Sequence, residues 1–465
     1  MFVMKKKFIR LIKKISPFEI KQAINALNNL RNLYISFFFW KKKCRLYKIN
    51  NGLNAVQKTL LFDLLFCQGG FHGGGEYGKA VFMELVKIIS SNNNTVVFIA
   101  INPSIYIEKS IIDLYKSNKK YVKIIRVNNY EDIVKLVNRD IFDIFFTPAI
   151  VVYAKGYKYM QTYGECIEFS CQNTKVYGTL HDIRDYELSK DNEKIFQFKK
   201  NIGCRYESNI SSNNRDNEKE EIIKYNEGLG IMYKTILNNP SITKLITVSH
   251  YSKESIVQEI FDPGEKIKVF YACMKQRFTP EKFMFDGIDF NGIKYLLAVN
   301  VGRYEKNGSA IVRAMDLLFS SDERLNDYFM VVTGVNSIND FDLYNLENIH
   351  KFIILGFLMP KHLEYLYKHA TCLLYISFNE GFGYPPIEAM SYGVPSVVSN
   401  LSSMPEICGE AAVYCDPFNI ESVKMAITDC LTNPPSSQIV EDRYKYITAK
   451  QNEDLKSLIS LLLND

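Results

Sequence analysis

Two glutamates, Glu380 and Glu388, lie on either side of a glycine turn formed by Gly381 and Gly383. Glycine lets a backbone approach a ligand closely, and the two prolines that follow the turn suit the start of a helix. Unpaired N–H groups at a helix start attract phosphate groups. The stretch therefore predicts a diphosphate site whose two carboxylates accept hydrogen bonds from sugar hydroxyls.

A second glycine-rich stretch, residues 69–80, reads GGFHGGGEYGKA. Its residues fit two phosphate-binding patterns, G-x-G-x-x-G (Gly73, Gly75, Gly78) and G-x-x-x-x-G-K (Gly73, Gly78, Lys79). Ala80 stands where a P-loop needs a hydroxyl, and the next expected strand ends at Asn102 instead of the acid of a dinucleotide fold. We expect phosphate contact at this helix start, but neither a P-loop nor a dinucleotide site.

Strands and helices that alternate along the chain must position these residues. The expected strands read LLFDLLFCQ, TVVFIAIN, YVKIIRV, IFDIFFTP, KVYGTLHD, KLITVSH and KIKVFY. A second series, after a linker at residues 274–292, reads KYLLAVNVG, YFMVVTG, HKFIILG, TCLLYIS, VPSVVSN and AAVYCDP. This alternation is typical of parallel sheets with helices on both faces, whose ligands bind beyond the carboxyl ends of the strands. We predict an α/β fold of two doubly wound Rossmann-like domains that face each other across a cleft.

The predicted organisation has four parts. Residues 1–55 form a basic amphipathic extension, residues 56–285 the first domain and residues 286–440 the second. Residues 441–465 are expected to form a helix that packs back toward the first domain. Within the first domain, the polar region 191–224 is expected to carry an exposed loop flanked by helices.

The stretch from Glu380 to Met390 follows the pattern E-G-F-G-x-P-x-x-E-A-M. The elements G-x-P, S-x-x-P-E and G-x-A-A come after it, at residues 393–395, 402–406 and 409–412. Together they resemble the donor-binding segment of the retaining glycosyltransferases of family 4, which have the GT-B fold. The resemblance extends over residues 65–430. It implies transfer of a sugar from a nucleoside-diphosphate sugar to an acceptor hydroxyl, with retention of configuration.

The resemblance also implies roles for single residues. Glu380, holding the donor sugar, and His181 are the expected catalytic residues. The other expected donor-binding residues lie in the glycine stretch, in VGRYEKNG and in the stretch after Glu380; they are Gly74, Gly75, Arg303, Lys306, Gly381, Phe382, Gly383 and Glu388, the last holding the ribose. Lys306 lies closer to Arg303 than the family's diphosphate-binding lysine does. The family needs no metal, so we expect neither a metal nor a cofactor and read the pair Asp340 and Asp342 as chance.

Charge is distributed unevenly along the chain. Residues 1–50 hold 13 Lys and Arg against one acid, Glu19, so this segment carries +12 and the remaining chain −6 of the net +6. A mildly acidic body argues against nucleic acid as a partner. One helical face of the basic segment is apolar (Phe8, Leu11, Ile12, Ile15), which suits an anionic membrane surface; the alternative is a solvated extension packed on the body.

Ten cysteines without a C-x-x-C pair suggest a reducing cytosol. We therefore expect a cytoplasmic enzyme that acts at the inner membrane face on a glycan or lipid-linked acceptor. Two alternatives are open. The first is another GT-B activity, such as a sugar-nucleotide epimerase or an α-glucan synthase, although the pattern around Glu380 and Glu388 argues against an epimerase. The second is a catalytically silent member that binds a nucleotide or serves as a scaffold, against which the intact Glu380, Glu388 and Arg303 argue.

Overall fold

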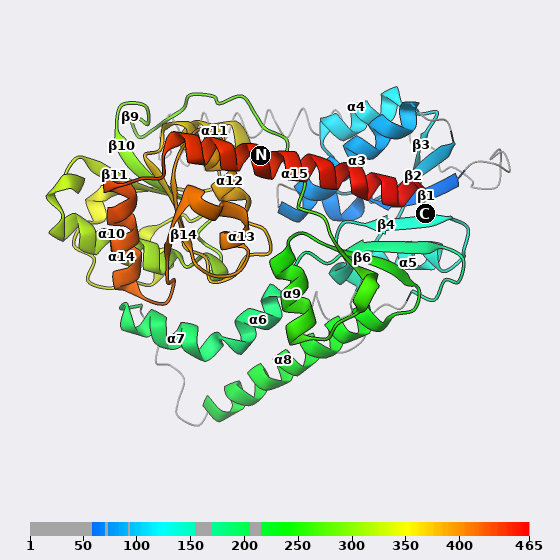
Figure 1. Ribbon diagram of the computed structural model, residues 1–465, viewed down its shortest axis with the longest axis horizontal. Helices are drawn as coiled ribbons and strands as arrows, with labels where there is room; N and C mark the ends of the chain where they lie inside the picture. Colours follow the sequence, from blue (N-terminus) through cyan, green and yellow to red (C-terminus); the bar gives the residue numbers. More distant parts are fainter. Residues whose placement is uncertain (1–57, 70–72, 92–93, 154–168, 205–214, 465) are drawn as a thin grey trace, which may run out of the picture.

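The computed structural model describes residues 58–69, 73–91, 94–153, 169–204 and 215–464 (Figure 1). For residues 215–226 it describes the backbone only. The basic extension at residues 1–55, and the membrane contact predicted for it, lie outside the described residues. In the part of the chain that is described, no helix combines the length and hydropathy needed to cross a bilayer.

In the described part of the N-terminal domain, seven parallel strands form a sheet of order β3-β2-β1-β4-β5-β6-β7. The strands are β1 (Lys58–Asp63), β2 (Thr95–Ile101), β3 (Val122–Arg126), β4 (Ile144–Thr147), β5 (Lys175–Thr179), β6 (Ile242–Thr247) and β7 (Ile267–Val269). The helices are α3 (Gly73–Ser91), α4 (Lys109–Ser117), α5 (Tyr130–Val137), α6 (Arg184–Lys190), α7 (Asn192–Asn201), α8 (Arg215–Asn238) and α9 (His250–Glu259). Every residue of β2 is buried, because helices cover both faces of a parallel sheet.

The C-terminal domain repeats this plan with the order β12-β11-β10-β13-β14-β15, again all parallel. Its strands are β10 (Lys294–Ala298), β11 (Tyr328–Thr333), β12 (Phe352–Leu355), β13 (Cys372–Tyr375), β14 (Ser396–Ser399) and β15 (Ala412–Cys415). Its helices are α10 (Gly308–Ser321), α11 (Pro360–His369), α12 (Tyr384–Met390), α13 (Met404–Cys408), α14 (Ile420–Thr432) and α15 (Ser437–Asn464). The predicted pair of doubly wound α/β domains is confirmed.

The first strand ends earlier than the apolar run LLFDLLFCQ predicts. β1 stops at Asp63, and Leu65–Cys67 form a 3₁₀ turn. The buried Asp63 carboxylate accepts hydrogen bonds from Leu65 N at 2.9 Å and from Thr147 Oγ1 at 2.9 Å. An acceptor-only side chain at a strand end can turn the backbone in this way, since it satisfies N–H groups that leave the ladder.

The linker contains a small antiparallel hairpin, β8 (Met284–Phe285) with β9 (Ile288–Asp289). The segment before the hairpin, from Tyr271 to Phe283, has no regular element and runs from one domain to the other. This path brings the side chains of Lys275 and Arg277 next to the C-terminal domain, where they contribute to the site described below.

Helix α15 lies along both domains (Figure 1). Near its start, Arg443 donates a hydrogen bond to Ile407 O of α13 at 2.9 Å. Farther along, Asp454 accepts one from Tyr271 N at 2.9 Å, and at its end Leu463 O accepts one from Lys58 Nζ of β1 at 2.9 Å. Buried apolar residues of α15, such as Leu458, join the core cluster of the N-terminal domain. The helix therefore joins the two domains.

Helix α7 makes a second connection between the domains. The polar region was expected to carry an exposed loop flanked by helices, and α7 and α8 lie on either side of residues 205–214. Helix α7 follows directly after α6 and packs on the C-terminal domain. Ile195 and Phe198 are buried in that domain's core cluster, and Arg313 Nε of α10 donates to Ile202 O at 2.7 Å. The expected exposed loop falls partly on residues 205–214, which lie outside the described residues.

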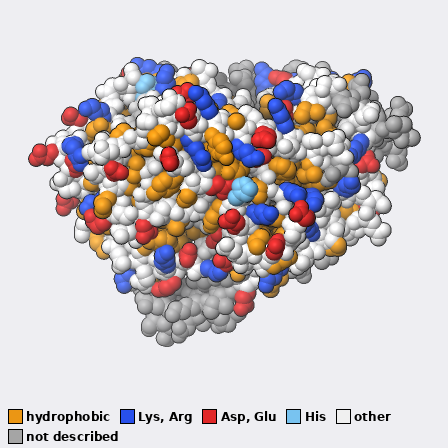
Figure 2. Space-filling model, in the orientation of Figure 1, with side chains coloured by type: hydrophobic (Ala, Val, Ile, Leu, Met, Phe, Trp, Pro, Cys, Tyr) orange, Lys and Arg blue, Asp and Glu red, His pale blue; other side chains and the backbone are white. Residues whose placement is uncertain are grey.

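On the face of the molecule seen in Figure 2, acidic and basic side chains are interspersed.

Candidate functional site

A cavity of about 610 Å³ lies where the two domains meet. Among its lining residues, Gly73 and Glu76 come from α3, Lys275 from the linker, Arg303 from the loop after β10, Tyr367 from α11 and Glu388 from α12. The cavity therefore lies beyond the carboxyl ends of the C-terminal strands, where α/β sheets bind ligands.

Glu388 faces this cavity with two hydrogen-bond partners. Its carboxylate accepts hydrogen bonds from Lys275 Nζ at 2.8 Å and from Tyr367 OH at 2.8 Å. Burial raises the pKa of Glu388, but the charge of Lys275 and the two hydrogen bonds outweigh burial, so the net pKa lies below the ordinary 4.5. Glu388 is therefore ionised at neutral pH and can accept hydrogen bonds from ligand hydroxyls.

Among the predicted phosphate-binding residues, Arg303 has the most exposed charged side chain, at about 56%. It lines the same cavity as Glu388 and forms an ion pair with Glu305. A guanidinium at a cavity wall can bind two phosphate oxygens side by side. Arg303 and Glu388 are thus brought to one cavity, as the sequence led us to expect.

Glu380 and Lys306 form a buried ion pair behind the cavity wall. Lys306 Nζ also contacts Tyr375 OH. Burial raises the pKa of Glu380, but Lys306 and Arg184 together lower it to below its ordinary 4.5. Neither Glu380 nor Lys306 is among the residues that line the cavity, and both side chains are buried.

His181 and Gly74 lie next to each other in the N-terminal domain. His181 Nε2 lies 2.8 Å from Pro148 O; because a carbonyl only accepts, this nitrogen is the donor. The imidazole stands edge-on to Tyr77, with ring centroids 5.0 Å apart. A Cβ atom on Gly74 would lie 3.5 Å from His181 Nε2 and 2.9 Å from Phe66, so glycine permits this approach. Gly75 is buried in the first turn of α3.

Gly381 joins the two halves of the site. Its carbonyl accepts hydrogen bonds from Ser249 Oγ at 2.6 Å and Ser252 Oγ at 3.1 Å, both in the N-terminal domain. A Cβ atom there would also collide with the carboxylate of Asp182, the residue after His181. Through this contact the segments that carry Glu380 and His181 lie next to each other.

The two remaining predicted residues have local structural roles. Gly383 has φ of 90° at the start of α12, and a Cβ atom there would collide with Met404. Phe382 does not line the cavity; its buried ring packs against Tyr271 and Tyr384, with centroids 5.5 Å away in each case. Asp340 belongs to the capping box of a 3₁₀ helix, Ile338–Phe341: its carboxylate accepts a hydrogen bond from the backbone N–H of the N-cap residue, Ser337, at 3.1 Å.

Sequence reasoning missed Lys275, Arg277, Tyr367 and Arg184. Arg277 donates to Glu364 at 2.6 Å and to Ser391 Oγ at 2.7 Å, beside the Glu388 pair. A usable signal was present: MKQR places two cations in the linker that follows the last strand of the first domain, and a linker between two such domains runs beside the cleft.

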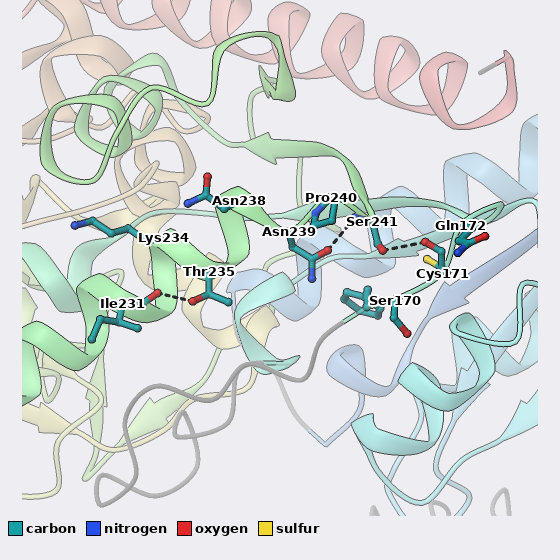
Figure 3. A pocket seen from close by; sticks show the side chains of 11 residues that line it. Ser170, Cys171, Gln172, Ile231, Lys234, Thr235, Asn238, Asn239, Pro240 and Ser241 are labelled. Carbon is teal, nitrogen blue, oxygen red and sulfur yellow. Dashed lines mark hydrogen bonds between the residues drawn. The ribbon is translucent and has the colours of Figure 1, made fainter.

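A second pocket, of about 880 Å³, lies in the N-terminal domain (Figure 3). It is lined by the last turns of α8, by residues 239–241 before β6 and by residues 169–172 before β5. None of the predicted site residues lines it. The predicted residues therefore favour the cavity between the domains as the functional site.

Comparison with known proteins agrees with this arrangement. Residues 281–452 match the family model "Glycosyl transferases group 1". The chain is 28% identical over 229 residues to "O-antigen chain mannosyltransferase B" of Escherichia coli, covering 46% of this chain and 58% of that protein. It is 29% identical over 189 residues to "O-antigen chain mannosyltransferase RfbU" of Salmonella typhimurium, covering 39% and 49%. The chain thus spans about half the length of the curated relatives it matches.

Solved structures match over most of the chain. A sucrose-phosphate synthase from Thermosynechococcus elongatus superposes with a TM-score of 0.56 at 13% identity, covering 88% of this chain and all of that one. Anabaena HepE in complex with UDP and glucose superposes with a TM-score of 0.54 at 13% identity, covering 88% and 100%. The fold is therefore GT-B, and residues 281–452 are similar to the glycosyl transferases of group 1.

Proposed function

We propose that this chain is a glycosyltransferase, one that resembles family 4 and moves a sugar from a nucleoside-diphosphate sugar to an acceptor hydroxyl with retention of configuration. The observation that carries the proposal is the cavity between the domains, which holds a cation and an ionised carboxylate, Arg303 and Glu388, beyond the strand ends. The match of residues 281–452 to a glycosyltransferase model supports it.

The charged residues of the site suit the charges that develop during sugar transfer. Sugar transfer passes through an oxocarbenium-like state while negative charge grows on the departing diphosphate. Arg303 at the cavity wall and Lys306 behind it would stabilise that charge, since fixed cations in a site with little water act strongly. Glu388 would accept hydrogen bonds from the ribose hydroxyls, and Glu380 from those of the transferred sugar. His181, beside Gly74 and near the Gly381 turn, would face the transferred sugar from the other domain.

The acceptor is proposed to be a glycan or lipid-linked glycan at the inner membrane face. Two relatives are named as O-antigen chain mannosyltransferases, and a structural neighbour with a TM-score of 0.51 and 11% identity is WaaG, a glycosyltransferase involved in lipopolysaccharide biosynthesis. The basic segment at residues 1–50 would hold the enzyme on anionic lipid. Equal binding to anionic and neutral vesicles, with and without residues 1–50, would rule this location out.

The first experiment is a thermal-shift and hydrolysis screen over mannose and glucose donors with uridine, guanosine and adenosine diphosphates, with EDTA present. We expect one donor to raise the melting temperature and to be hydrolysed slowly without a metal. Glu388→Ala should lose both effects, while Glu410→Ala, an exposed carboxylate outside the cavity, should keep them. If no donor binds either protein, a silent scaffold becomes the better account.

A further inference from the structure

Both basic side chains that line the cavity are already paired with carboxylates. Lys275 binds Glu388 at 2.8 Å, and Arg303 binds Glu305. A diphosphate that binds either cation therefore competes with a carboxylate for that cation. Arg303 is the easier one to take, because its side chain is about 56% exposed whereas that of Lys275 is 23% exposed.

If Arg303 turns to a ligand, the Glu305 carboxylate loses the cation with which it is paired. The Glu305 side chain is only 10% exposed, and its Oε1 accepts no hydrogen bond of normal geometry among the described residues. A buried carboxylate that loses its cation is costly, since neither water nor a hydrogen bond compensates for the charge. Donor binding through Arg303 would be weakened by this cost unless another cation replaced it.

Such a cation lies close by, on the other domain. Arg184, at the start of α6, has its Nη1 4.0 Å from Glu305 Oε1 and 3.9 Å from Asp182 Oδ2. A small side-chain shift would bring it within hydrogen-bond distance of Glu305. Resting on the proposed function, we propose that Arg184 is a positioning residue that takes over Glu305 when Arg303 turns to the donor diphosphate.

The surroundings of Arg184 support this exchange. Asp182 raises the pKa of Arg184 most, burial opposes it, and Glu380 and Glu305 raise it further, so the guanidinium stands in the combined field of these three carboxylates. Its helix is anchored to the C-terminal domain by the following helix α7, whose Phe198 packs on Phe378 with ring centroids 6.2 Å apart. The Arg184 guanidinium is therefore held at the boundary between the two domains before any donor binds. One consequence is that donor binding strengthens a contact between the two domains.

The test is a double-mutant cycle on Arg184 and Glu305. Affinity for uridine, guanosine and adenosine diphosphates is measured by calorimetry, together with kcat and KM for the donor found in the screen. Arg184→Gln should weaken binding of the nucleoside diphosphate roughly tenfold, because Arg303 then stays with Glu305. Arg184→Lys should recover most of the loss. The double variant Arg184→Gln, Glu305→Gln should bind within about threefold of wild type, since no buried carboxylate then competes for Arg303.

The outcomes separate the two proposals. Lys190→Gln, on the same helix but paired with Glu259 outside the cavity, is the matched control and should bind like wild type. If wild type binds a nucleoside diphosphate but Glu305→Gln gives no rescue of Arg184→Gln, the positioning role is wrong and the proposed function stands. If wild type binds none of the three, the proposed function fails and this inference fails with it.

Discussion

At the scale of single residues, the site is a set of carboxylate–cation pairs in which the partners come from distant parts of the chain. Glu388 of α12 is paired with Lys275 of the linker, and Glu380 with Lys306 after β10. Both glutamates have lowered pKa values. Each carboxylate is consequently charged at neutral pH and held in a fixed position, which hydrogen bonding to sugar hydroxyls requires.

The Glu388 pair makes stability depend on pH. A carboxyl whose pKa is lowered on folding stabilises the protein above its unfolded pKa, ordinarily 4.5. This contribution is lost as the pH falls through the folded value. Glu388→Gln should therefore lower the free energy of unfolding by about 2 kcal/mol at neutral pH, and the difference from wild type should shrink below pH 4.5. Urea titrations at several pH values measure it. A pH-independent difference would contradict the prediction, and Glu410→Gln should match wild type throughout.

Gly381 offers a second residue-scale prediction. A Cβ atom at this position would collide with the Asp182 carboxylate and come within 3.1 Å of Asp182 Cγ. Gly381→Ala should push the two segments apart, cost about 1–3 kcal/mol of stability and lower donor turnover at least tenfold. Gly292→Ala is the control, since its Cβ would make an ordinary contact of 3.4 Å. Wild-type turnover in Gly381→Ala would show that the contact is not needed for the reaction.

At the scale of elements, the strands were predictable because strands buried on both faces read as short apolar runs. β2 and β11 lie inside the predicted strands TVVFIAIN and YFMVVTG. The first strand was predicted to extend too far, because the turn that follows Asp63 is as apolar in composition as the strand itself. The positions of Glu388 and Arg303 at one cavity followed from the rule for strand ends. The contacts of Lys275 and Arg184 did not, because no local pattern tells which distant carboxylate a cation meets.

Helix α7 could not be placed from sequence for a related reason. Its composition is polar, and its buried residues Ile195 and Phe198 lie on a face whose partner is another domain. Phe198 stacks edge-on against Phe378 and Phe418, with centroids 6.2 and 5.9 Å away. Phe378 directly precedes the Asn379–Glu380 segment of the site, so this helix supports the donor side.

Removing that aromatic contact should loosen the helix. Phe198→Ala deletes a buried ring and should cost about 3 kcal/mol or more; the loss should expose α7 to proteolysis before the domains unfold. Gln197→Ala, on the exposed side of the same helix, is the control. Timed proteolysis with mass spectrometry identifies the cut sites. Equal cleavage of both variants within α7 would mean that Phe198 does not anchor the helix.

At the scale of the whole molecule, helix α15, helix α7 and the start of α9 are three of the contacts that connect the two domains. At the third, Glu406 of α13 accepts hydrogen bonds from His250 N and Tyr251 N at 2.8 Å each. A carboxylate at a helix N-terminus is favourable because it satisfies free N–H groups and the helix dipole. Here the helix and its carboxylate belong to different domains, so the stabilisation favours the domain arrangement of the structure.

Closure of the domains should therefore weaken when this carboxylate is removed. Glu406→Ala should cost about 1–2 kcal/mol, and the loss should fall on the contact between the domains because each domain keeps its own core. We expect small-angle scattering to give a larger radius of gyration for Glu406→Ala than for wild type without ligand, and a donor nucleotide to reduce the difference. Glu410→Ala, an exposed carboxylate on the same stretch, should scatter like wild type. An unchanged radius with a lower melting temperature would instead place the role of Glu406 in folding of the individual domains. Since α15 and α7 still hold the domains together, the variant should open without separating them.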